Sequence, residues 1–265
     1  MERTTRLAAL LRQLRLTTMV HGYEQLATDA AQANWSYAQY LLALTEQEVA
    51  YRDQQRYRHC SKQARFPVLK ELGDFDFAAL PSLNRARVLG LAQGAYLPGA
   101  ENVLLVGNPG LGKTHIATGL GLAACRQGQR VRFYTAAGLV NELLAAQDAH
   151  RLDRLIERTL KYQLIVLDEL GFLPLSTTGA QLLFQFCSAL HERVSLIVTT
   201  NLRFTDWPQV FGNPSLTAAL LDRLTARAHI LEFVGESFRL RQRAQRERDG
   251  RVPESAGAPQ EVVPF

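Results

Sequence analysis

Eight residues near the middle of the chain have the types and spacing of a phosphate-binding loop. They match the pattern G-x-x-x-x-G-K-[S/T] and read Gly107-Asn108-Pro109-Gly110-Leu111-Gly112-Lys113-Thr114. Glycines let the backbone wrap closely around a phosphate, and successive N–H groups and the start of the following helix then bind the anion. We expect Lys113 to reach the β- and γ-phosphates and the Thr114 hydroxyl to bind Mg²⁺. The loop therefore predicts an ATP site.

Two acidic residues follow a short apolar run, Leu164-Ile165-Val166-Leu167. We expect Asp168 to hold Mg²⁺, directly or through water, and Glu169 to orient and deprotonate the attacking water. Acids at a strand end are common on their own. This pair gains weight because its place after the phosphate loop suits a site assembled from neighbouring strands. The pair favours water as the nucleophile, and so hydrolysis of ATP over phosphoryl transfer to a metabolite.

Polar residues further along the chain are candidates for the same site. Asn201 ends the run Val198-Thr199-Thr200-Asn201, where its amide would bind the attacking water or the γ-phosphate; the alternative is a cap on a turn. Arg223 carries the group that stabilises charge on the γ-phosphate in the transition state, from its own or a neighbouring subunit. A surface salt bridge is the alternative, and Arg227 is a rival one turn later. Arg239 is a further candidate for a phosphate contact.

The elements that must position these residues alternate between strands and helices. Short apolar runs are typical of strands buried on both faces, and they occupy residues 103–106, 164–167 and 196–198; a further strand is expected at 131–134. Helical patterns occupy 114–128, 137–149, 152–162, 178–192 and 216–227, and a last strand is expected at 230–233. This alternation predicts βαβ units and a parallel sheet flanked by helices, which is an α/β fold.

The residues before this region predict helices. Leu7, Leu10, Leu11 and Leu14 share one face of a helix over 4–19, and helical patterns follow at 23–33 and 37–66. Pro67 and Gly73 interrupt the pattern, and residues 74–81 are expected to form a linker. We therefore expect a small helical domain over 1–70, which binds DNA or a partner, and an ATPase domain over 71–250. A disordered tail is expected over 251–265.

The 265 residues carry a net charge of +5, and the excess lies on both flanks of a neutral middle. Residues 237–251 hold six arginines against two acids, and residues 51–66 place Arg58, Lys62 and Arg65 on one helical face. Such basic faces bind DNA phosphates without reading sequence, although a solvated helix surface is the alternative. The three cysteines form no CxxC pair, and neither a signal peptide nor a membrane span is predicted. A cytoplasmic protein is therefore expected.

Taken together, the motifs resemble the IstB-like ATP-binding proteins of insertion sequences, which are AAA+ ATPases related to the helicase loader DnaC and the initiator DnaA. The similarity covers roughly residues 5–245. It lies in GNPGLGKT at 107, LIVLDEL at 164, TTN at 199, NPSLTAALLDRL at 213 and ESFRL at 236. The phosphate loop is shared by many families, so the stretch at 213–240 and the helical N-terminus carry the distinction.

The resemblance implies an AAA+ P-loop NTPase core preceded by a small all-helical domain. It also implies ATP and Mg²⁺ between the subunits of a homo-oligomer, with Arg223 acting in trans. The partners would be double-stranded DNA and a cognate transposase, which the protein assists in selecting target DNA. The family often has a His-rich stretch where this chain has Thr225-Ala226-Arg227-Ala228, so the choice between Arg223 and Arg227 stays open.

Two other functions remain as alternatives. A DnaC-like helicase loader would share the same core, but its N-terminal domain would bind a replicative helicase instead of DNA. A nucleotide-binding adaptor without hydrolysis is the second alternative. The intact Lys113, Asp168 and Glu169 speak against that adaptor, because each of them serves hydrolysis.

Overall fold

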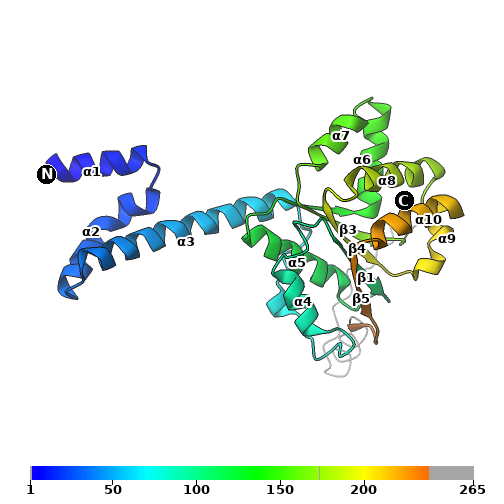
Figure 1. The fold of residues 1–265 in the computed structure, drawn as a ribbon, viewed down its shortest axis with the longest axis horizontal. Coiled ribbons are helices and arrows are strands. Elements are labelled where there is room, and N and C mark those ends of the chain that lie inside the picture. The colour runs from blue at the N-terminus through cyan, green and yellow to red at the C-terminus, as the bar shows by residue number, and fades with distance from the viewer. Residues whose placement is uncertain (1, 173, 239–265) are drawn as a thin grey trace, which may run out of the picture.

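The computed structural model describes residues 2–172 and 174–238, so Arg239, the arginine-rich run that follows it and the predicted tail lie outside the described residues. The body is a parallel five-stranded sheet with the strand order β2-β3-β4-β1-β5 (Figure 1). Its strands are β1 (Asn102–Gly107), β2 (Val131–Thr135), β3 (Leu164–Leu170), β4 (Ser195–Thr200) and β5 (Ala228–Phe233). The predicted α/β fold is confirmed. The expectation that the phosphate loop and the acid pair follow neighbouring strands is wrong, because β4 lies between β1 and β3.

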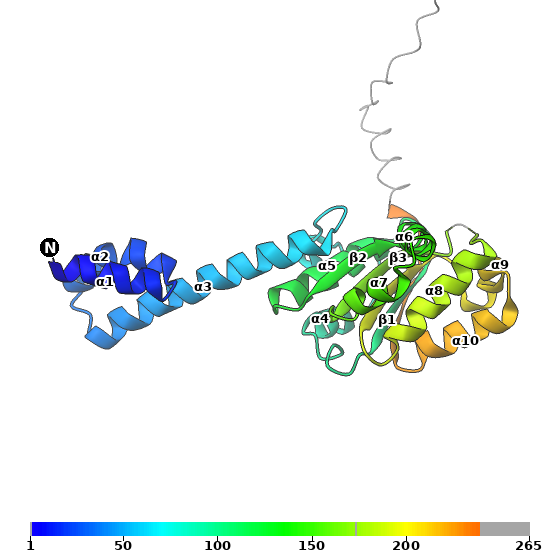
Figure 2. The same cartoon turned by 90° about the horizontal axis from the view of Figure 1, so that it is seen from above.

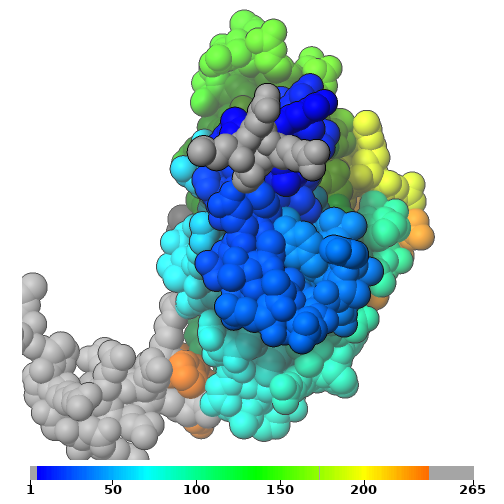
Figure 3. Space-filling view, turned by 90° about the vertical axis from the view of Figure 1, so that its left-hand side faces the viewer, coloured from blue at the N-terminus to red at the C-terminus, as the bar shows by residue number. Residues whose placement is uncertain are grey.

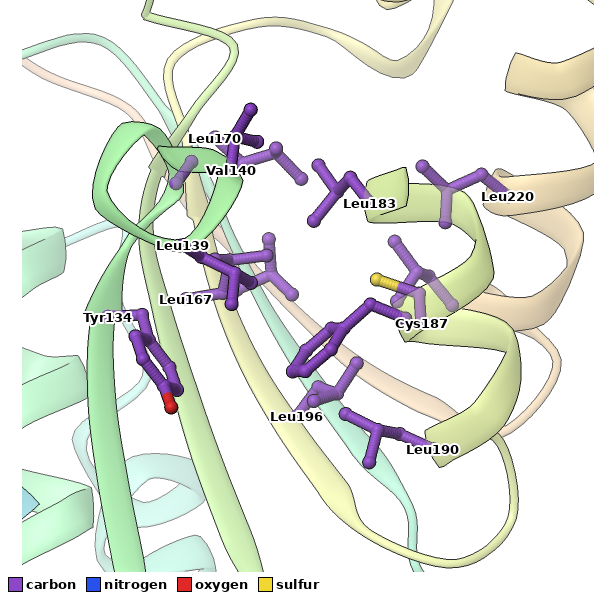
Figure 4. Close-up of a cluster of buried hydrophobic side chains, with 14 of the residues drawn as sticks. Tyr134, Leu139, Val140, Leu167, Leu170, Leu183, Cys187, Leu190, Leu196 and Leu220 are labelled. Atoms are coloured by element: carbon purple, nitrogen blue, oxygen red, sulfur yellow. The ribbon is translucent and has the colours of Figure 1, made fainter. Parts of the chain in front are cut away.

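One face of the sheet is covered by the helices of the second half of the chain. These are α6 (Ala136–Asp148), α7 (Leu152–Thr159), α8 (Thr177–Leu190), α9 (Pro208–Phe211) and α10 (Pro214–Thr225). Side chains alternate between the two faces of a strand, so Leu104, Leu167 and Val198 all point into this core. Figure 4 shows Leu139 of α6 and Leu183 of α8 converging on Leu167. This close packing helps to fix the alignment of β3 with β4.

The other face is covered by α5 (Lys113–Arg126), α4 (Arg85–Ala92) and the last turns of α3. The segment that leaves α3, residues 66–75, runs along α5 and includes the short 3₁₀ helix η1 (Leu72–Asp74). Phe66, Leu72 and Phe75 occupy the space in which side chains at three glycines would lie: a Cβ would approach them to 2.8 Å at Gly121, 2.6 Å at Gly119 and 2.6 Å at Gly112. The small residues of α5 therefore let this segment lie directly on the helix.

The N-terminal helices are α1 (Glu2–Gln13), α2 (Thr17–Gln32) and α3 (Tyr37–Ala64). The single helix expected over 4–19 is wrong, because Arg15 has a φ of 56° and breaks the helix. The 28-residue α3 carries α1 and α2 away from the body (Figures 1 and 2). Seen from its free end, this projection stands in front of the body (Figure 3). We call α1, α2 and residues 37–56 the arm.

The far end of α3 is part of the body. Cys60 and Ala64 are buried in the core beneath the sheet, and Arg132 of β2 donates a hydrogen bond to the Gln63 carbonyl oxygen. The domain boundary at residue 70 stays a prediction, and α3 joins the arm and the body as one continuous helix. Cys60 and the other two cysteines, Cys125 and Cys187, are free and buried, and burial raises the pKa of the Cys187 thiol to about 12. That thiol is therefore unreactive at neutral pH.

Within residues 2–172 and 174–238, no helix has both the length and the apolar character needed to cross a bilayer.

Candidate nucleotide site

The phosphate loop lies between the end of β1 and the start of α5, as the sequence predicted. Gly112 forms the N-cap of α5 with a φ of 87°, a conformation that suits glycine because it has no Cβ. Lys113 follows and is buried, with 9% of its surface exposed. Its ammonium group donates hydrogen bonds of 2.6 Å to the Gly107 carbonyl oxygen and 2.8 Å to that of Asn108. The positive charge thus lies inside the curve of the loop, next to the N-terminus of α5, where a phosphate binds.

The loop meets the first acid directly. The Thr114 Oγ1 atom lies 3.0 Å from both carboxylate oxygens of Asp168, which is 4% exposed. A hydroxyl and a carboxylate from two different segments are therefore in contact at one point. These hard oxygen donors match the ligands that Mg²⁺ prefers.

The second acid occupies an irregular position in β3. Leu167 pairs with Val198 and Leu170 with Thr200, so two residues of β3, Asp168 and Glu169, stand opposite a single residue of β4. This is a β-bulge, and Glu169 within it has a left-handed φ of 61°. Successive side chains of a regular strand point to opposite faces. Here Asp168 contacts Thr114, and Glu169 lines a pocket that Thr114 also lines. The bulge therefore brings both acids to the phosphate loop.

The single residue opposite the bulge is Thr199, which was not among the residues predicted for the site. Its Oγ1 atom accepts a 2.9 Å hydrogen bond from the Glu169 N–H and donates one to Asp168 Oδ1. Thr199 is 2% exposed and lines the pocket. The sequence offered one signal for this contact, a threonine two residues before the predicted Asn201. The bulge that selects Thr199 is not visible in the sequence.

The pocket has a volume of about 590 Å³, within the range that holds small-molecule ligands. Residues 109–114 of the phosphate loop, Glu169 and Asn201 line it. The lining also includes Phe75, Asp76 and Leu80 of the segment predicted as a linker, and Phe238 after β5. Phe238 also donates its backbone N–H to the Gly110 carbonyl oxygen, at 3.1 Å. The segments before and after the sheet thus complete a cavity whose lining includes apolar side chains, suited to a nucleobase, as well as the polar residues of the phosphate loop.

The two candidate arginine fingers lie elsewhere. Arg223 donates a 2.9 Å hydrogen bond to the Ala219 carbonyl oxygen, and its guanidinium lies 4.8 Å from the centre of the Phe184 ring. Arg227 is exposed at the end of α10. Neither residue is part of the wall of this pocket. The structure of one chain therefore does not bring Arg223 to the predicted phosphate site, and the third candidate, Arg239, lies outside the described residues.

The donor atoms bear on which metal ion the site would take. Among the described residues, no cluster of three or more His, Cys, Asp or Glu side chains has the geometry to bind a metal ion by itself. Mg²⁺ commonly needs one or two carboxylates and completes its coordination with water and substrate phosphates. Thr114 and Asp168 fit such a shared site, because they lie at the phosphate loop.

Comparison with known proteins decides the family. The family model for IstB-like ATP-binding proteins matches residues 9–246 of the chain. The chain belongs to this family. Among its relatives, a protein of insertion sequence IS21 from Pseudomonas aeruginosa, named for ATP binding, is 36% identical over 89% of either chain. The corresponding protein of insertion sequence IS232 from Bacillus thuringiensis subsp. berliner is 33% identical, over 90% of this chain and 96% of that one.

Solved structures extend the comparison from sequence to fold. The replication initiator DnaA, bound to AMPPCP and single-stranded DNA, superimposes with a TM-score of 0.51 over 70% of this chain and 56% of its own, at 16% identity. At this identity the likeness concerns the fold alone. This member of the IstB-like family therefore has the AAA+ P-loop architecture that the sequence predicted, with helices before the sheet.

Proposed function

We propose that the protein binds ATP with Mg²⁺ and hydrolyses it. The contact between Thr114 and Asp168 at the phosphate loop carries this proposal, because it joins the two groups that would hold the metal. Membership of the IstB-like family supports the ligand, since relatives are named for ATP binding. All eight loop residues, Gly107 to Thr114, would surround the phosphates, and Lys113 would exchange its carbonyl partners for phosphate oxygens.

In this proposal the two acids have separate tasks. Asp168 and Thr114 hold Mg²⁺, which neutralises phosphate charge when bound. Glu169 accepts a proton from the attacking water, and Asn201 orients that water or the γ-phosphate. Asn201 and Glu169 line the same pocket, which supports a shared role.

Two substitutions test this division. Lys113→Ala is expected to abolish ATP binding, measured with a fluorescent ATP analogue, while Lys161→Ala on the exposed surface leaves it unchanged. Glu169→Gln is expected to keep ATP bound and to block turnover, with Glu157→Gln as its exposed control. Normal ATP affinity in Lys113→Ala would overturn the site, and rapid hydrolysis by Glu169→Gln would remove Glu169 as the base.

We further propose that the protein forms an ATP-dependent homo-oligomer in which Arg223 completes the site of the next subunit. The position of Arg223 outside its own pocket is consistent with a role in trans. Arg223→Ala is then expected to bind ATP normally and to hydrolyse it slowly. If Arg227→Ala has this phenotype and Arg223→Ala does not, the finger is Arg227.

The proposed role is to assemble on double-stranded DNA and to assist a cognate transposase in selecting target DNA. Two relatives named for insertion sequences support this setting. Arg58 and Lys62 are exposed on α3, on the side away from the buried Cys60, and Arg65 is exposed at the C-cap that ends the helix. They therefore present positive charge to solvent close to the body of the molecule, where DNA phosphates can reach it.

Salt dependence tests the DNA contact. Replacing Arg58, Lys62 and Arg65 with Ala is expected to lower the slope of log K against log salt by about three, because each phosphate contact contributes about one. The matched control replaces Arg151, Arg154 and Lys161, which are exposed near α7. An unchanged slope in the first variant would remove α3 from the DNA interface.

A helicase loader of the DnaC type remains the alternative. The large apolar side chains exposed on the arm, such as Leu14, Leu41 and Val49, favour a protein partner for the arm. If the purified protein with ATP does not bind duplex DNA at low salt but binds a replicative helicase, the loader function replaces the transposition function.

A further inference from the structure

We propose that Thr199 is a positioning residue for both acids of the site: its hydroxyl holds the bulge that aims Asp168 at the metal position and Glu169 at the attacking water. This inference rests on the proposed ATP hydrolysis and deepens it. It concerns a residue that neither binds phosphate nor exchanges a proton with substrate.

The first observation is the place of Thr199 in the sheet. It is the one residue of β4 opposite the two bulged residues of β3, between the pairs Leu167–Val198 and Leu170–Thr200. On its other side it pairs with Leu105 of β1, the strand that leads into the phosphate loop. Thr199 is therefore held from both sides by strands that carry the site.

The second observation is that the hydroxyl uses both of its bonding capacities on the bulge. It accepts from the Glu169 N–H and donates to Asp168 Oδ1, so it ties together the backbone of one acid and the side chain of the other. A bulge leaves a ladder N–H without its usual partner, and the Thr199 hydroxyl supplies that partner to Glu169. Thr199 itself is 2% exposed, and a hydrogen bond of this kind contributes about 0.5–1.5 kcal/mol.

The third observation is the backbone strain at Glu169. A residue other than glycine in the left-handed region, here with a φ of 61°, persists because its surroundings hold it. The hydrogen bond from the Glu169 N–H is such a restraint. Without it, β3 can relax toward regular pairing, which would turn one of the two acids to the opposite face of the sheet.

The carboxylate of Asp168 shows why a second hydroxyl is needed. Thr114 Oγ1 contacts both of its oxygens, but Thr114 is the residue expected to turn its own oxygen to Mg²⁺. Thr199 then remains as the donor that fixes Oδ1, and Oδ2 would be the oxygen available to Mg²⁺. Outer partners of this kind commonly change metal affinity or activity by 10- to 100-fold when removed.

The test compares Thr199→Val, which keeps the shape and removes the hydroxyl, with Thr199→Ser, which keeps the hydroxyl. In Thr199→Val we expect kcat for ATP to fall by about 10- to 100-fold, while the Kd for an ATP analogue measured without divalent metal changes less than about threefold. Thr199→Ser is expected to restore most of the rate. Thr159→Val is the matched control, because Thr159 is a buried threonine of α7 whose hydroxyl bonds within its own helix.

A second readout does not depend on turnover. With a non-hydrolysable ATP analogue bound, Mn²⁺ affinity measured by electron paramagnetic resonance should fall by about 10-fold or more in Thr199→Val and recover in Thr199→Ser. Normal turnover and normal Mn²⁺ affinity in Thr199→Val would overturn the proposal. So would an equal loss in Thr199→Ser and Thr199→Val, which would indicate a packing role. If the wild-type protein binds the analogue but does not hydrolyse ATP, the proposed function fails, and Mn²⁺ affinity alone decides the role of Thr199.

Discussion

The forces that stabilise the arm differ from those that stabilise the body. The body buries apolar side chains on both faces of its sheet, and Leu104, Leu105 and Leu183 are at most 1% exposed. In the arm, few large apolar side chains are buried, and several are exposed, such as Leu14 at 65% and Leu41 at 60%. Apolar burial therefore stabilises the body far more than the arm.

Polar contacts take over where the arm lacks a core. Glu48 of α3 is 3% exposed and accepts hydrogen bonds from the Thr18 and Met19 N–H groups at the start of α2. Arg52 binds Glu48 and also donates to the Arg15 carbonyl oxygen just after α1. Two side chains of α3 thus fix the turn between α1 and α2. Burial keeps the body in one geometry, whereas the arm leaves apolar side chains exposed.

The largest expected difference is in unfolding free energy, when a leucine is replaced by alanine once in the body and once in the arm. Leu183→Ala in the body leaves a cavity in a closed core and is expected to cost about 2–5 kcal/mol of unfolding free energy. Leu41→Ala in the arm is expected to change it by less than about 0.5 kcal/mol, because the side chain is exposed. Chemical denaturation measures both. Equal losses would mean that the arm of the free protein is covered, for example in an oligomer.

A smaller effect is expected where the arm joins the body. A Cβ at Gly119 would lie 2.6 Å from Leu72 Cδ2 and 3.2 Å from the Leu72 backbone nitrogen, so Gly119→Ala must displace the segment along α5. We expect a loss of about 1–3 kcal/mol, measured as a lower Tm. Gly90→Ala in α4 is the control, since nothing lies within 4 Å of its added Cβ. That variant should gain up to about 1 kcal/mol from helix propensity; a loss there as large as at Gly119 would refute the steric explanation.

The polar junction of the arm is expected to respond locally. Glu48→Gln removes the charge that binds Arg52 and the two N–H groups, at a cost of about 1–3 kcal/mol to the arm. Hydrogen exchange should speed up at Thr18 and Met19 and stay constant in the sheet. Glu46→Gln, on the exposed side of the same helix, should change neither. Faster exchange throughout the sheet would show that arm and body unfold as one unit.

Lowering the pH should reproduce part of the loss of arm stability expected for Glu48→Gln. Burial raises the pKa of Glu48, but hydrogen bonds from Arg52 and from the Thr18 and Met19 N–H groups outweigh it and lower the pKa below the ordinary value of 4.5. The contribution of Glu48 to stability is therefore complete above 4.5 and is lost as the pH falls through the lowered pKa. Fluorescence of Trp35 should report this loosening of the arm. The Trp35 signal is the part of the fluorescence that disappears in Trp35→Phe. Glu48→Gln should remove the dependence, and a transition that persists in it would be due to other groups.

The body was more predictable from sequence than the arm, and physical reasons explain the difference. Three continuous apolar runs and the run Val131-Arg132-Phe133-Tyr134 identified strands, and the glycines and Lys113 identified the loop. Strand order, however, depends on contacts between distant segments, so the position of β4 between β1 and β3 was not visible. In the arm, the break at Arg15 depends on contacts with Arg52 and Glu48 of a different helix.

Within the site, one extra residue in β3 limited what the sequence could predict. Side chains in a strand alternate with a period of two, so a bulge changes which of Thr199, Thr200 and Asn201 meets the acids. Polar residues at that strand end were predictable, but the contact made by Thr199 was not. The pocket-lining residues Phe75, Asp76 and Leu80 were missed for another reason: a segment without periodicity has no signal until the helix it packs on is known.

The continuity of α3 has a mechanical consequence. Its 28 residues span about 42 Å at about 1.5 Å per residue, and one end is packed beside α5, the helix that begins at Lys113. A rotation of one degree about that end moves the other end by about 0.7 Å, through simple leverage along a helix of this length. If α3 follows α5 as a rigid rod, a tilt of α5 by a few degrees would therefore displace Tyr37 by several ångströms. A small change at the phosphate loop would then move the far end of the arm directly.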